Sequence, residues 1–419
     1  MLGVVPSCAS AASTALVLTC ALLSGYLGAL TLAGGRTWRA GIQPKNGRRR
    51  RFVIVVPAHD EEPVIARALE SFSKLDYPAD RYEVHVVADN CTDGTAAVVR
   101  RHGVEVHERT APDDRGKGPA LNWITEILED RPDPPDVYVI VDADTQVEPT
   151  FLGELDAALD SPGVEVVQGS YLVSEPETSG TTALRYAALA CRHHLRGLGR
   201  TRIGASCGLY GNGMAISRSV LSGRRWSGHL VEDAEFQMEL LLDDVVVTYA
   251  PRVRLHAEMP ASRAGATSQN ERWELGRMQL ARRYVPTLLS RAIRSRHRRI
   301  AHVDAVFDVL VPPLSVLSIA QAGSVASALV LYSTRRRRAD RLRLALAGVS
   351  AATLAAHVIV GLRLVDAPPA VYRSLLGAPR AIVWKAALWV RVIVAPDRVS
   401  WTRTERNGRG LTWSAEAGR

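Results

Sequence analysis

A stretch without any Asp, Glu, Lys or Arg extends from Ser7 to Ala33. A helix needs about 20 apolar residues to cross the hydrocarbon core of a bilayer, so this stretch is long enough to span it. A cleaved secretory signal would have a basic start and a shorter apolar core, whereas no Lys or Arg precedes Arg36 here. We therefore expect residues 1–50 to form a retained transmembrane anchor that is followed by a basic linker.

Further apolar segments lie near the C-terminus, and we assign residues 303–419 to a transmembrane or interfacial region. The apolar segments run over Val303–Tyr332, which contains Pro312-Pro313, and over Leu344–Leu364. Ala378–Val394 mixes Trp with cations, which is typical of an interfacial or short spanning helix. In residues 276–302 the spacing predicts amphipathic helices at the membrane surface, with apolar positions at Leu280, Tyr284, Leu288 and Leu289.

Basic charge lies mainly beside these apolar segments. The chain has 52 Lys+Arg against 43 Asp+Glu, a net charge of +9, and Arg48–Arg51 follow the first segment. No nucleic-acid-binding pattern is present, so this charge favours a membrane partner and not a nucleic acid. The positive-inside bias places the central region in the cytoplasm at the cell membrane. Two simple C-terminal spans would, however, put Arg335–Arg338 outside, so a re-entrant first segment remains an alternative.

The central region, residues 51–275, alternates apolar runs with helical patterns. Expected strands are Phe52–Val56, Val84–Val87, Val104–His107 and Val137–Val141. Val137–Val141 is apolar without alternation, and helical segments separate the four runs, so together they predict an α/β domain with a buried parallel sheet. The five cysteines show no C-x-x-C spacing, so they indicate neither a disulfide framework nor a zinc site.

Polar clusters stand where three of these strands end. They are His59–Glu62, Asp89–Gly94 and Asp142–Asp144. In open α/β sheets, ligands bind beyond the carboxyl ends of the strands. The three clusters together therefore predict one site along this rim.

Asp142 and Asp144 point to a metal ion. Two carboxylates at the end of a buried strand repel each other unless a cation neutralises them. Mg²⁺ or Mn²⁺ accepts one or two carboxylates together with phosphate oxygens. A solvated turn or a helix cap is the alternative interpretation, and the position directly after an apolar strand makes it weaker.

Other segments carry groups suited to an anionic ligand. Lys117 lies between two glycines, although the loop lacks P-loop spacing. Asp233 can act as a general base, or Glu232 and Asp233 can be ordinary first-turn acids of a helix. Arg272 can stabilise a leaving anion beside the indole of Trp273. Gly213 belongs to a turn-prone segment that permits close approach of a ligand.

In order and spacing, these motifs resemble those of the membrane-bound family 2 glycosyltransferases, the group of cellulose, chitin and hyaluronan synthases. The resemblance runs from about Arg51 to Trp273 and rests on Val56–Glu62, Asp89, Lys117, Asp142-x-Asp144, Glu232-Asp233 and Gln269-x-x-Arg272-Trp273. Trp384-Lys385 with Trp401–Thr404 also resembles the smaller bacterial members.

The resemblance implies a GT-A type, Rossmann-like fold and inverting transfer of a sugar from a nucleotide diphosphate, with UDP as the expected carrier. The acceptor would be a hydroxyl of a lipid or glycan, and a divalent metal would assist. The implied nucleotide-sugar contacts are Pro57, Asp60, Glu61, Asp89, Lys117, Asp142 and Asp144; the metal ligands are Asp142 and Asp144; the acceptor or diphosphate contacts are Gly213, Glu232, Gln269, Arg272 and Trp273; and the catalytic base is Asp233.

Two other classes compete with this interpretation. A dinucleotide-dependent oxidoreductase would need G-x-G-x-x-G after the first strand, where this chain has Pro57-Ala58-His59-Asp60. A noncatalytic membrane-anchored nucleotide-binding or interaction protein remains the main alternative. The chain also departs from the family pattern: His59-Asp60 replaces a frequent Tyr-Asn, and Val231 replaces a frequent Thr before Glu232.

Overall fold

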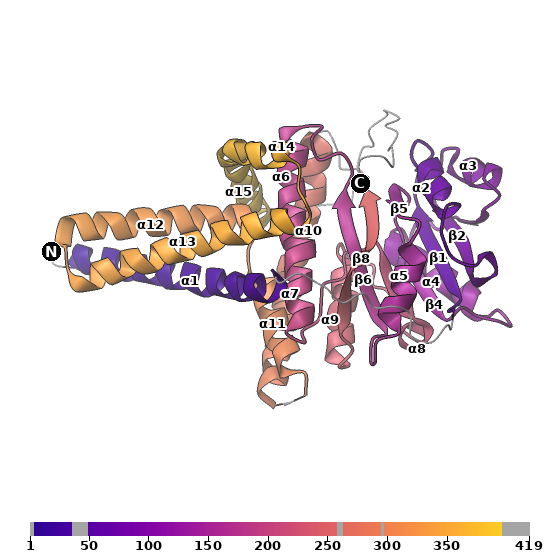
Figure 1. Cartoon of the computed structure of the whole chain (residues 1–419), viewed down its shortest axis with the longest axis horizontal. Helices are drawn as coiled ribbons and strands as arrows, with labels where there is room; N and C mark the ends of the chain where they lie inside the picture. The colour runs from indigo at the N-terminus through magenta and orange to yellow at the C-terminus, as the bar shows by residue number, and fades with distance from the viewer. Residues whose placement is uncertain (1–3, 36–48, 258–262, 295–296, 396–419) are drawn as a thin grey trace.

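The computed structural model describes residues 4–35, 49–257, 263–294 and 297–395. It has two parts, an α/β domain and a rod of long helices that projects from it (Figure 1). The basic linker residues Arg36, Arg39 and Lys45 and the segment Trp401–Thr404 lie outside the described residues.

An eight-stranded mixed sheet forms the centre of the α/β domain, in the order β3-β2-β1-β4-β7-β6-β8-β5. The strands are β1 Phe52–Ala58, β2 Tyr82–Asp89, β3 Glu105–Arg109, β4 Val137–Ile140, β5 Thr145–Val147, β6 Val166–Val173, β7 Met214–Ser217 and β8 Val247–Ala257. The predicted parallel unit is present as β1 to β4, since β1 pairs in parallel with β2 and β4, and β2 with β3. β7 runs antiparallel to β4, so the whole sheet is mixed and not purely parallel.

Helices cover both faces of this sheet. They are α2 Ile65–Phe72, α3 Thr95–Arg101, α4 Lys117–Glu129, α5 Phe151–Leu159, α6 Gly180–Leu189, a π-helical turn Ala190–Leu195, α7 Arg196–Arg202, α8 Arg218–Leu221 and α9 Glu232–Leu242, with a 3₁₀ turn at Ala79–Arg81. Alternate residues of β1 enter opposite cores: Ile54 packs with Phe72 of α2, and Val55 packs with Ile124 of α4. Burial on both faces explains why the β1 sequence is apolar without alternation.

The rod consists of α1 Val4–Gly34, α12 Leu314–Arg335 and α13 Arg338–Leu364. Among the described residues, these three helices are long and apolar enough to cross a membrane, which agrees with the spans expected near both ends of the sequence. Small and polar side chains hold them together. The hydroxyls of Ser13 and Ser327 lie 3.0 Å apart, and Thr31 Oγ1 lies 2.7 Å from Nδ1 of His357. Such contacts are typical of helix packing in lipid.

The expected segment Val303–Tyr332 is not one helix. It breaks at Pro312-Pro313 into α11 Arg299–Leu310 and α12, because proline lacks the amide that helix continuation needs. α12 and α13 form a simple antiparallel hairpin, and their connection at Arg335–Arg338 lies at the end of the rod remote from the sheet (Figure 1). Arg343 of α13 donates to Oγ1 of Thr14 near the start of α1, which places that helix start at the same end. The re-entrant alternative is therefore wrong for this structure.

α10 Arg263–Arg294 is one long helix, so the expected domain boundary between residues 275 and 276 falls inside it. Leu280, Tyr284 and Leu288 are buried against α11 and α9, while Leu289 is exposed. Three of the four apolar positions are thus covered by protein, while Leu289, Ile293 and Ile300 of the segment 276–302 are exposed. The chain continues through α14 Pro369–Ser374 and a 3₁₀ turn at Leu375–Gly377 to α15 Ala378–Val394, which contacts α10 and α12.

Buried ion pairs join the two parts. α7 packs directly on the end of α1, where Arg202 donates to the carbonyl oxygens of Ala33 and Gly34. Two residues earlier, Arg200 Nε lies 2.6 Å from Asp304 Oδ2 of α11, and both side chains are buried. Tyr26 of α1 donates to Asp304 Oδ1 at 2.9 Å, which links this ion pair to the rod. A buried pair of this kind is costly to break, so it favours one fixed arrangement of domain and rod.

Candidate active site

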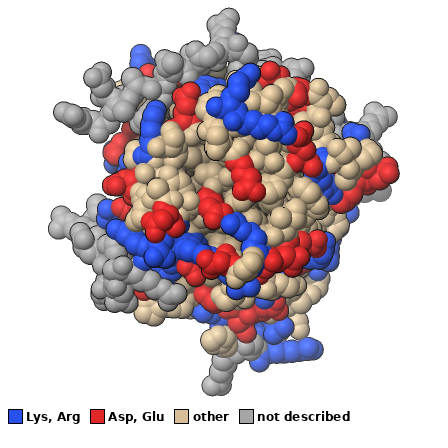
Figure 2. All heavy atoms as spheres, turned by 90° about the vertical axis from the view of Figure 1, so that its right-hand side faces the viewer, with Lys and Arg blue, Asp and Glu red and all other residues tan. Residues whose placement is uncertain are grey.

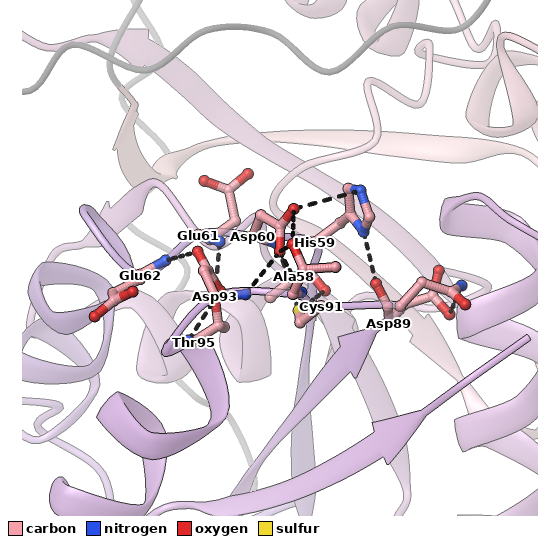
Figure 3. A network of polar contacts seen from close by, with 11 residues as sticks. Ala58, His59, Asp60, Glu61, Glu62, Asp89, Cys91, Asp93 and Thr95 are labelled. Atoms are coloured by element: carbon pink, nitrogen blue, oxygen red, sulfur yellow. Dashed lines mark hydrogen bonds and ion pairs between the residues drawn. The ribbon is translucent and has the colours of Figure 1, made fainter. Parts of the chain in front are cut away.

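The loop after β1 supplies the first acidic group of the site. Asp60 accepts hydrogen bonds on Oδ1 from the amides of Thr92, at 2.6 Å, and Asp93, at 3.2 Å (Figure 3). Burial alone would raise the pKa of Asp60, but these amide donors and nearby His59 outweigh it, and the pKa is lowered. Its backbone lies in the left-handed region with φ 54°, which short polar residues such as Asp tolerate.

Asp89, at the end of β2, forms a buried ion pair. Its Oδ1 lies 2.7 Å from Nη1 of Arg109, at the end of the neighbouring edge strand β3. The ring of His59 lies 2.7 Å from the backbone oxygen of Asp89 and so joins the first two loops (Figure 3). The Glu61 amide donates to Oγ1 of Thr95, and its carbonyl accepts from the first amides of α2. Pro57 lies within β1 opposite Val87.

Lys117 connects distant parts of the chain. It is the first residue of α4, and its Nζ contacts Asp142 Oδ1 and the carbonyl oxygen of Gly211. Burial lowers the pKa of Lys117, but Asp142, Glu232 and Asp233 raise it more, so the net shift is upward. The ammonium is therefore held charged among three carboxylates.

A short buried network fixes the connection after β4. The Asp142 amide donates to Oδ1 of Asn212, whose amide nitrogen donates to Thr145 Oγ1. Gln168 of β6 donates to the Asn212 carbonyl at 2.8 Å. Gly213 has φ 66°, and a Cβ there would lie 2.4 Å from Leu255 Cδ2, so only glycine fits. This network holds Asp142 and Asp144 on the rim.

Asp233 lies beside the same lysine. A Cβ on Gly211 would lie 3.2 Å from Asp233 Oδ2 and 3.4 Å from Lys117 Nζ, so these two groups meet across a glycine that has φ 76°. The pKa of Asp233 is raised, first by burial and also by Asp142. Burial and the adjacent Asp233 raise the pKa of Glu232 to about 7. A carboxyl group whose pKa is raised toward neutrality suits proton transfer at physiological pH, and the pKa of Asp233 is shifted in that direction.

α10 closes the site on the side of the helical rod. Arg185 of α6 donates to Gln269 Oε1 and lies over the ring of Trp273, 5.9 Å from its centroid. Burial lowers the pKa of Arg272, and Glu232 opposes that shift, which indicates that the two side chains interact. Gly276 permits this approach, because a Cβ there would lie 2.6 Å from the Val231 side chain.

Asp142 and Asp144 fit a hard divalent cation. Both are half-buried carboxylates two positions apart in the connection after β4. Oxygen ligands are those that Mg²⁺ and Mn²⁺ prefer, and two carboxylates leave coordination positions for phosphate oxygens. The donor set therefore suits the predicted metal when a phosphorylated ligand completes it.

The structure thus brings the sequence-predicted residues to one rim, from Asp60 and Asp89 through Lys117 and Asp142 to Asp233. It also adds side chains that sequence reasoning missed: Arg109, Gln168, Arg185, Arg192 and Asn212. Of these, Asn212 carried a signal, since it lies between Gly211 and Gly213 in a turn-prone segment.

Figure 2 shows the face of the α/β domain that points away from the rod. Acidic and basic side chains lie next to each other across this face. The excess basic charge of the chain is therefore not gathered there.

A nucleotide-binding α/β protein is the class that this fold and site define, since acidic and basic groups meet beyond the carboxyl ends of the parallel strands. A model described as "Glycosyltransferase like family 2" matches residues 49–276, more than half of the chain. The chain belongs to this family. The family membership and the observed sheet confirm the expected GT-A type α/β fold.

Named relatives agree with this membership. The chain is 27% identical over 235 residues to a beta-monoglucosyldiacylglycerol synthase of Nostoc sp. (strain PCC 7120 / SAG 25.82 / UTEX 2576), covering 54% of this chain and 48% of that protein. It is 25% identical over 244 residues to the probable glycosyltransferase YdaM of Bacillus subtilis (strain 168), covering 55% and 56%. The chain spans about half the length of the curated relatives it matches.

Among solved structures, the mannosyltransferase PcManGT of Pyrobaculum calidifontis, in complex with GDP-Man and Mn²⁺, is similar with a TM-score of 0.49 and 18% identity. The similarity covers 84% of this chain and 99% of that chain.

Proposed function

We propose that the protein transfers a sugar, with inversion, from a nucleotide-diphosphate sugar to a hydroxyl of a lipid or glycan at the cytoplasmic membrane face. UDP is the expected carrier. The observation that carries this proposal is the position of Asp233: a carboxylate of raised pKa beside Lys117, which itself contacts Asp142.

The transfer step needs a base and a charge-stabilised leaving group. Asp233 takes the proton of the acceptor hydroxyl as the oxygen forms a bond to the anomeric carbon. The bond from that carbon to the diphosphate oxygen breaks, and its electron pair leaves with the nucleoside diphosphate. One displacement from the opposite face inverts the anomeric configuration. Base catalysis of this kind contributes about 10² to 10⁴-fold.

Cations around Asp233 suit the departing diphosphate. Lys117 is held among carboxylates on one side, and Arg272 lies near Glu232 on the other. Fixed positive groups aimed at developing negative charge are a strong source of catalysis. Asp142 and Asp144 would hold the divalent metal, which supplies further charge neutralisation when it is bound. Pro57, Asp60, Glu61 and Asp89 line the part of the rim assigned to the nucleoside.

Support for a lipid acceptor comes from where the acceptor side of the site lies. α10 carries Gln269, Arg272 and Trp273, and Lys385 of α15 lies 3.1 Å from Glu274 of α10. α15 also contacts the candidate spanning helix α12. The acceptor side therefore adjoins the helical rod, and the Nostoc relative is named for a glycolipid product. Gly213, whose amide donates to the Ile140 carbonyl of β4, lies beside the connection that carries the proposed metal ligands.

The charge distribution supports a cytoplasmic catalytic domain in the cell membrane. Arg36, Arg39, Lys45 and Arg48–Arg51 follow α1 in the sequence, and the end of α1 at Gly34 contacts Arg202 of the α/β domain. Cations close to a span favour the cytoplasmic side. They outnumber the four arginines Arg335–Arg338 at the remote end of the rod.

A panel of radiolabelled nucleotide sugars, incubated with the purified full chain and membrane lipids, tests this function. We expect one α-linked UDP-sugar to give a β-linked glycolipid, with the anomeric configuration read by NMR. Chelator should abolish transfer and added Mn²⁺ or Mg²⁺ should restore it, while Asp144→Asn should need more metal. A retained α configuration, or full transfer in excess chelator, would contradict the proposal.

A further inference from the structure

A second group of metal-ligating side chains lies on the edge of the sheet, away from the metal-binding carboxylates Asp142 and Asp144. His85 is on β2, and Glu105 and His107 are on the neighbouring edge strand β3. The two imidazoles stack with ring centroids 5.3 Å apart, and His107 also contacts Trp123 of α4 edge-on. The three side chains therefore lie under α4 and come from strands that pair in parallel.

Their ligand atoms converge on one point. His85 Nδ1 lies 3.0 Å from His107 Nε2 and 3.6 Å from Glu105 Oε2, and His107 Nε2 lies 3.3 Å from Glu105 Oε1. A tetrahedral zinc ion with bonds of 2.0–2.1 Å spaces its ligand atoms about 3.3 Å apart. The two ring nitrogens and one oxygen of Glu105 all lie within 4.8 Å of one another, so small side-chain adjustments bring them to the spacing of three corners of a zinc tetrahedron.

A neighbouring carboxylate fixes the tautomer that binding needs. Nε2 of His85 lies 3.0 Å from Glu83 Oε2. Because a carboxylate is an acceptor, Nε2 carries the proton, and the lone pair is on Nδ1, which faces the cluster. Glu83 is in turn held by two hydrogen bonds from Arg131. Metal-binding histidines commonly have such a carboxylate on the second ring nitrogen.

Burial and charge also suit a metal. His85 is buried, His107 is half-buried and Glu105 is exposed, so an ion can enter from solvent along Glu105. The nearby positive charge of Arg131 would disfavour a bound cation, but Arg131 forms an ion pair with Glu83.

We propose that His85, Glu105 and His107 form a site for a zinc-class divalent cation, with water in the fourth position. Two imidazoles and one carboxylate are a recognised zinc ligand set, whereas Mg²⁺ prefers oxygen ligands alone. The ion would cross-link edge strand β3 to β2, two to four residues before the Asp89–Arg109 pair at the rim. This site goes beyond the proposed sugar transfer and does not depend on it.

Binding of Co²⁺ and Zn²⁺ to the purified full chain tests the proposal. We expect one equivalent of Co²⁺ to give the visible absorption of a tetrahedral complex, which Zn²⁺ displaces. His107→Gln and Glu105→Gln should each weaken binding at least tenfold, since each removes a ligand. Glu83→Gln should weaken it about 10- to 100-fold through the orientation of His85. His102→Gln, directly after α3, is the matched control.

Two comparisons keep the test decisive. Asp144→Asn should retain the Co²⁺ signal, because Asp144 is a proposed ligand of the metal at the nucleotide-sugar site and not of the His85–Glu105–His107 site. Glu105 is exposed, so Glu105→Gln should fold normally, and its metal-free thermal unfolding should match that of the parent. Failure of the parent to take up one equivalent, or an unchanged spectrum and affinity in both Glu105→Gln and His107→Gln, would overturn the proposal.

Discussion

The carboxyl groups of the site differ in pKa because their surroundings differ. Glu232 and Asp233 both have raised pKa values, caused first by burial, whereas the pKa of Asp60 is lowered by amide donors. A carboxylate that is protonated near neutral pH can exchange protons during turnover, while an ionised one suits a fixed hydrogen-bond acceptor. The assignment of Asp233 as base and Asp60 as a nucleoside contact agrees with this difference.

The pH profile of transfer tests this environment. A base works only when ionised, so kcat/KM should fall at acidic pH. The raised pKa of Asp233 moves this acidic limb of the pH profile above the range of an ordinary aspartate. Glu232→Gln removes a neighbouring negative charge, so Asp233 should ionise at lower pH and the acidic limb should move down. Glu70 is exposed on α2, so Glu70→Gln should not change the pH at which kcat/KM falls. An acidic limb that does not move in Glu232→Gln would show that Asp233 does not sense this carboxylate.

Much of this site follows from the sequence at the residue scale, but the pairing of its side chains does not. Motif order was enough to select Asp142, Asp144 and Asp233. The Asp89–Arg109 pair depends on β3 ending beside β2, and the motif offers no sign that Arg109 is a partner. Likewise, Lys117 meets Asp142 and Gly211 only because α4 starts at the rim.

At the scale of helices and strands, an element is easiest to predict from the sequence when its buried positions are apolar. β1 and β4 have the clearest signal, because both of their faces are buried and their sequences are almost continuously apolar. β6 was not predicted, since its buried face includes Gln168 and Ser170, whose polarity is compensated by distant partners. The break between α11 and α12 has a visible signal in Pro312-Pro313.

The contact between α9 and α10 is the element-scale test. A Cβ on Gly276 would lie 2.6 Å from the Val231 side chain, so Gly276→Ala should push α10, and with it Arg272, away from Glu232. Misplacing a charge-stabilising group by about 1 Å can cost about 10²-fold in rate. We expect kcat to fall at least tenfold with little change in thermal unfolding.

Val231→Ala supplies the control, because it removes the atoms that the new methyl group would meet. The double variant Gly276→Ala/Val231→Ala should recover most of the lost activity. Equal loss in the single and double variants would mean that Gly276 acts through something other than this contact.

At the scale of the whole molecule, the helical rod determines the position of the α/β domain relative to the membrane. α1, α12 and α13 lie side by side, and the Arg335–Arg338 connection is at the end remote from the sheet (Figure 1). Hydropathy predicted the spans, yet the position of this connection needed the packing of all three helices. If the rod spans the bilayer, the connection and the catalytic domain face opposite sides.

Cysteine labelling of intact cells tests this orientation. In a Cys8→Ser background, which removes an exposed thiol of α1, Ser333→Cys should react with a membrane-impermeant maleimide from outside. Lys74→Cys, exposed after α2, should react only after permeabilisation. Labelling of both positions from the same side would contradict a spanning rod.

The central claim is that Asp233 is the base of a site shared with Lys117 and the Asp142–Asp144 metal ligands. Its most direct test compares donor binding and sugar transfer in Asp233→Asn, with exposed Asp130→Asn as the control. We predict that Asp233→Asn binds the donor with unchanged affinity and loses transfer by about 10² to 10⁴-fold. Unchanged transfer by purified Asp233→Asn would contradict the claim.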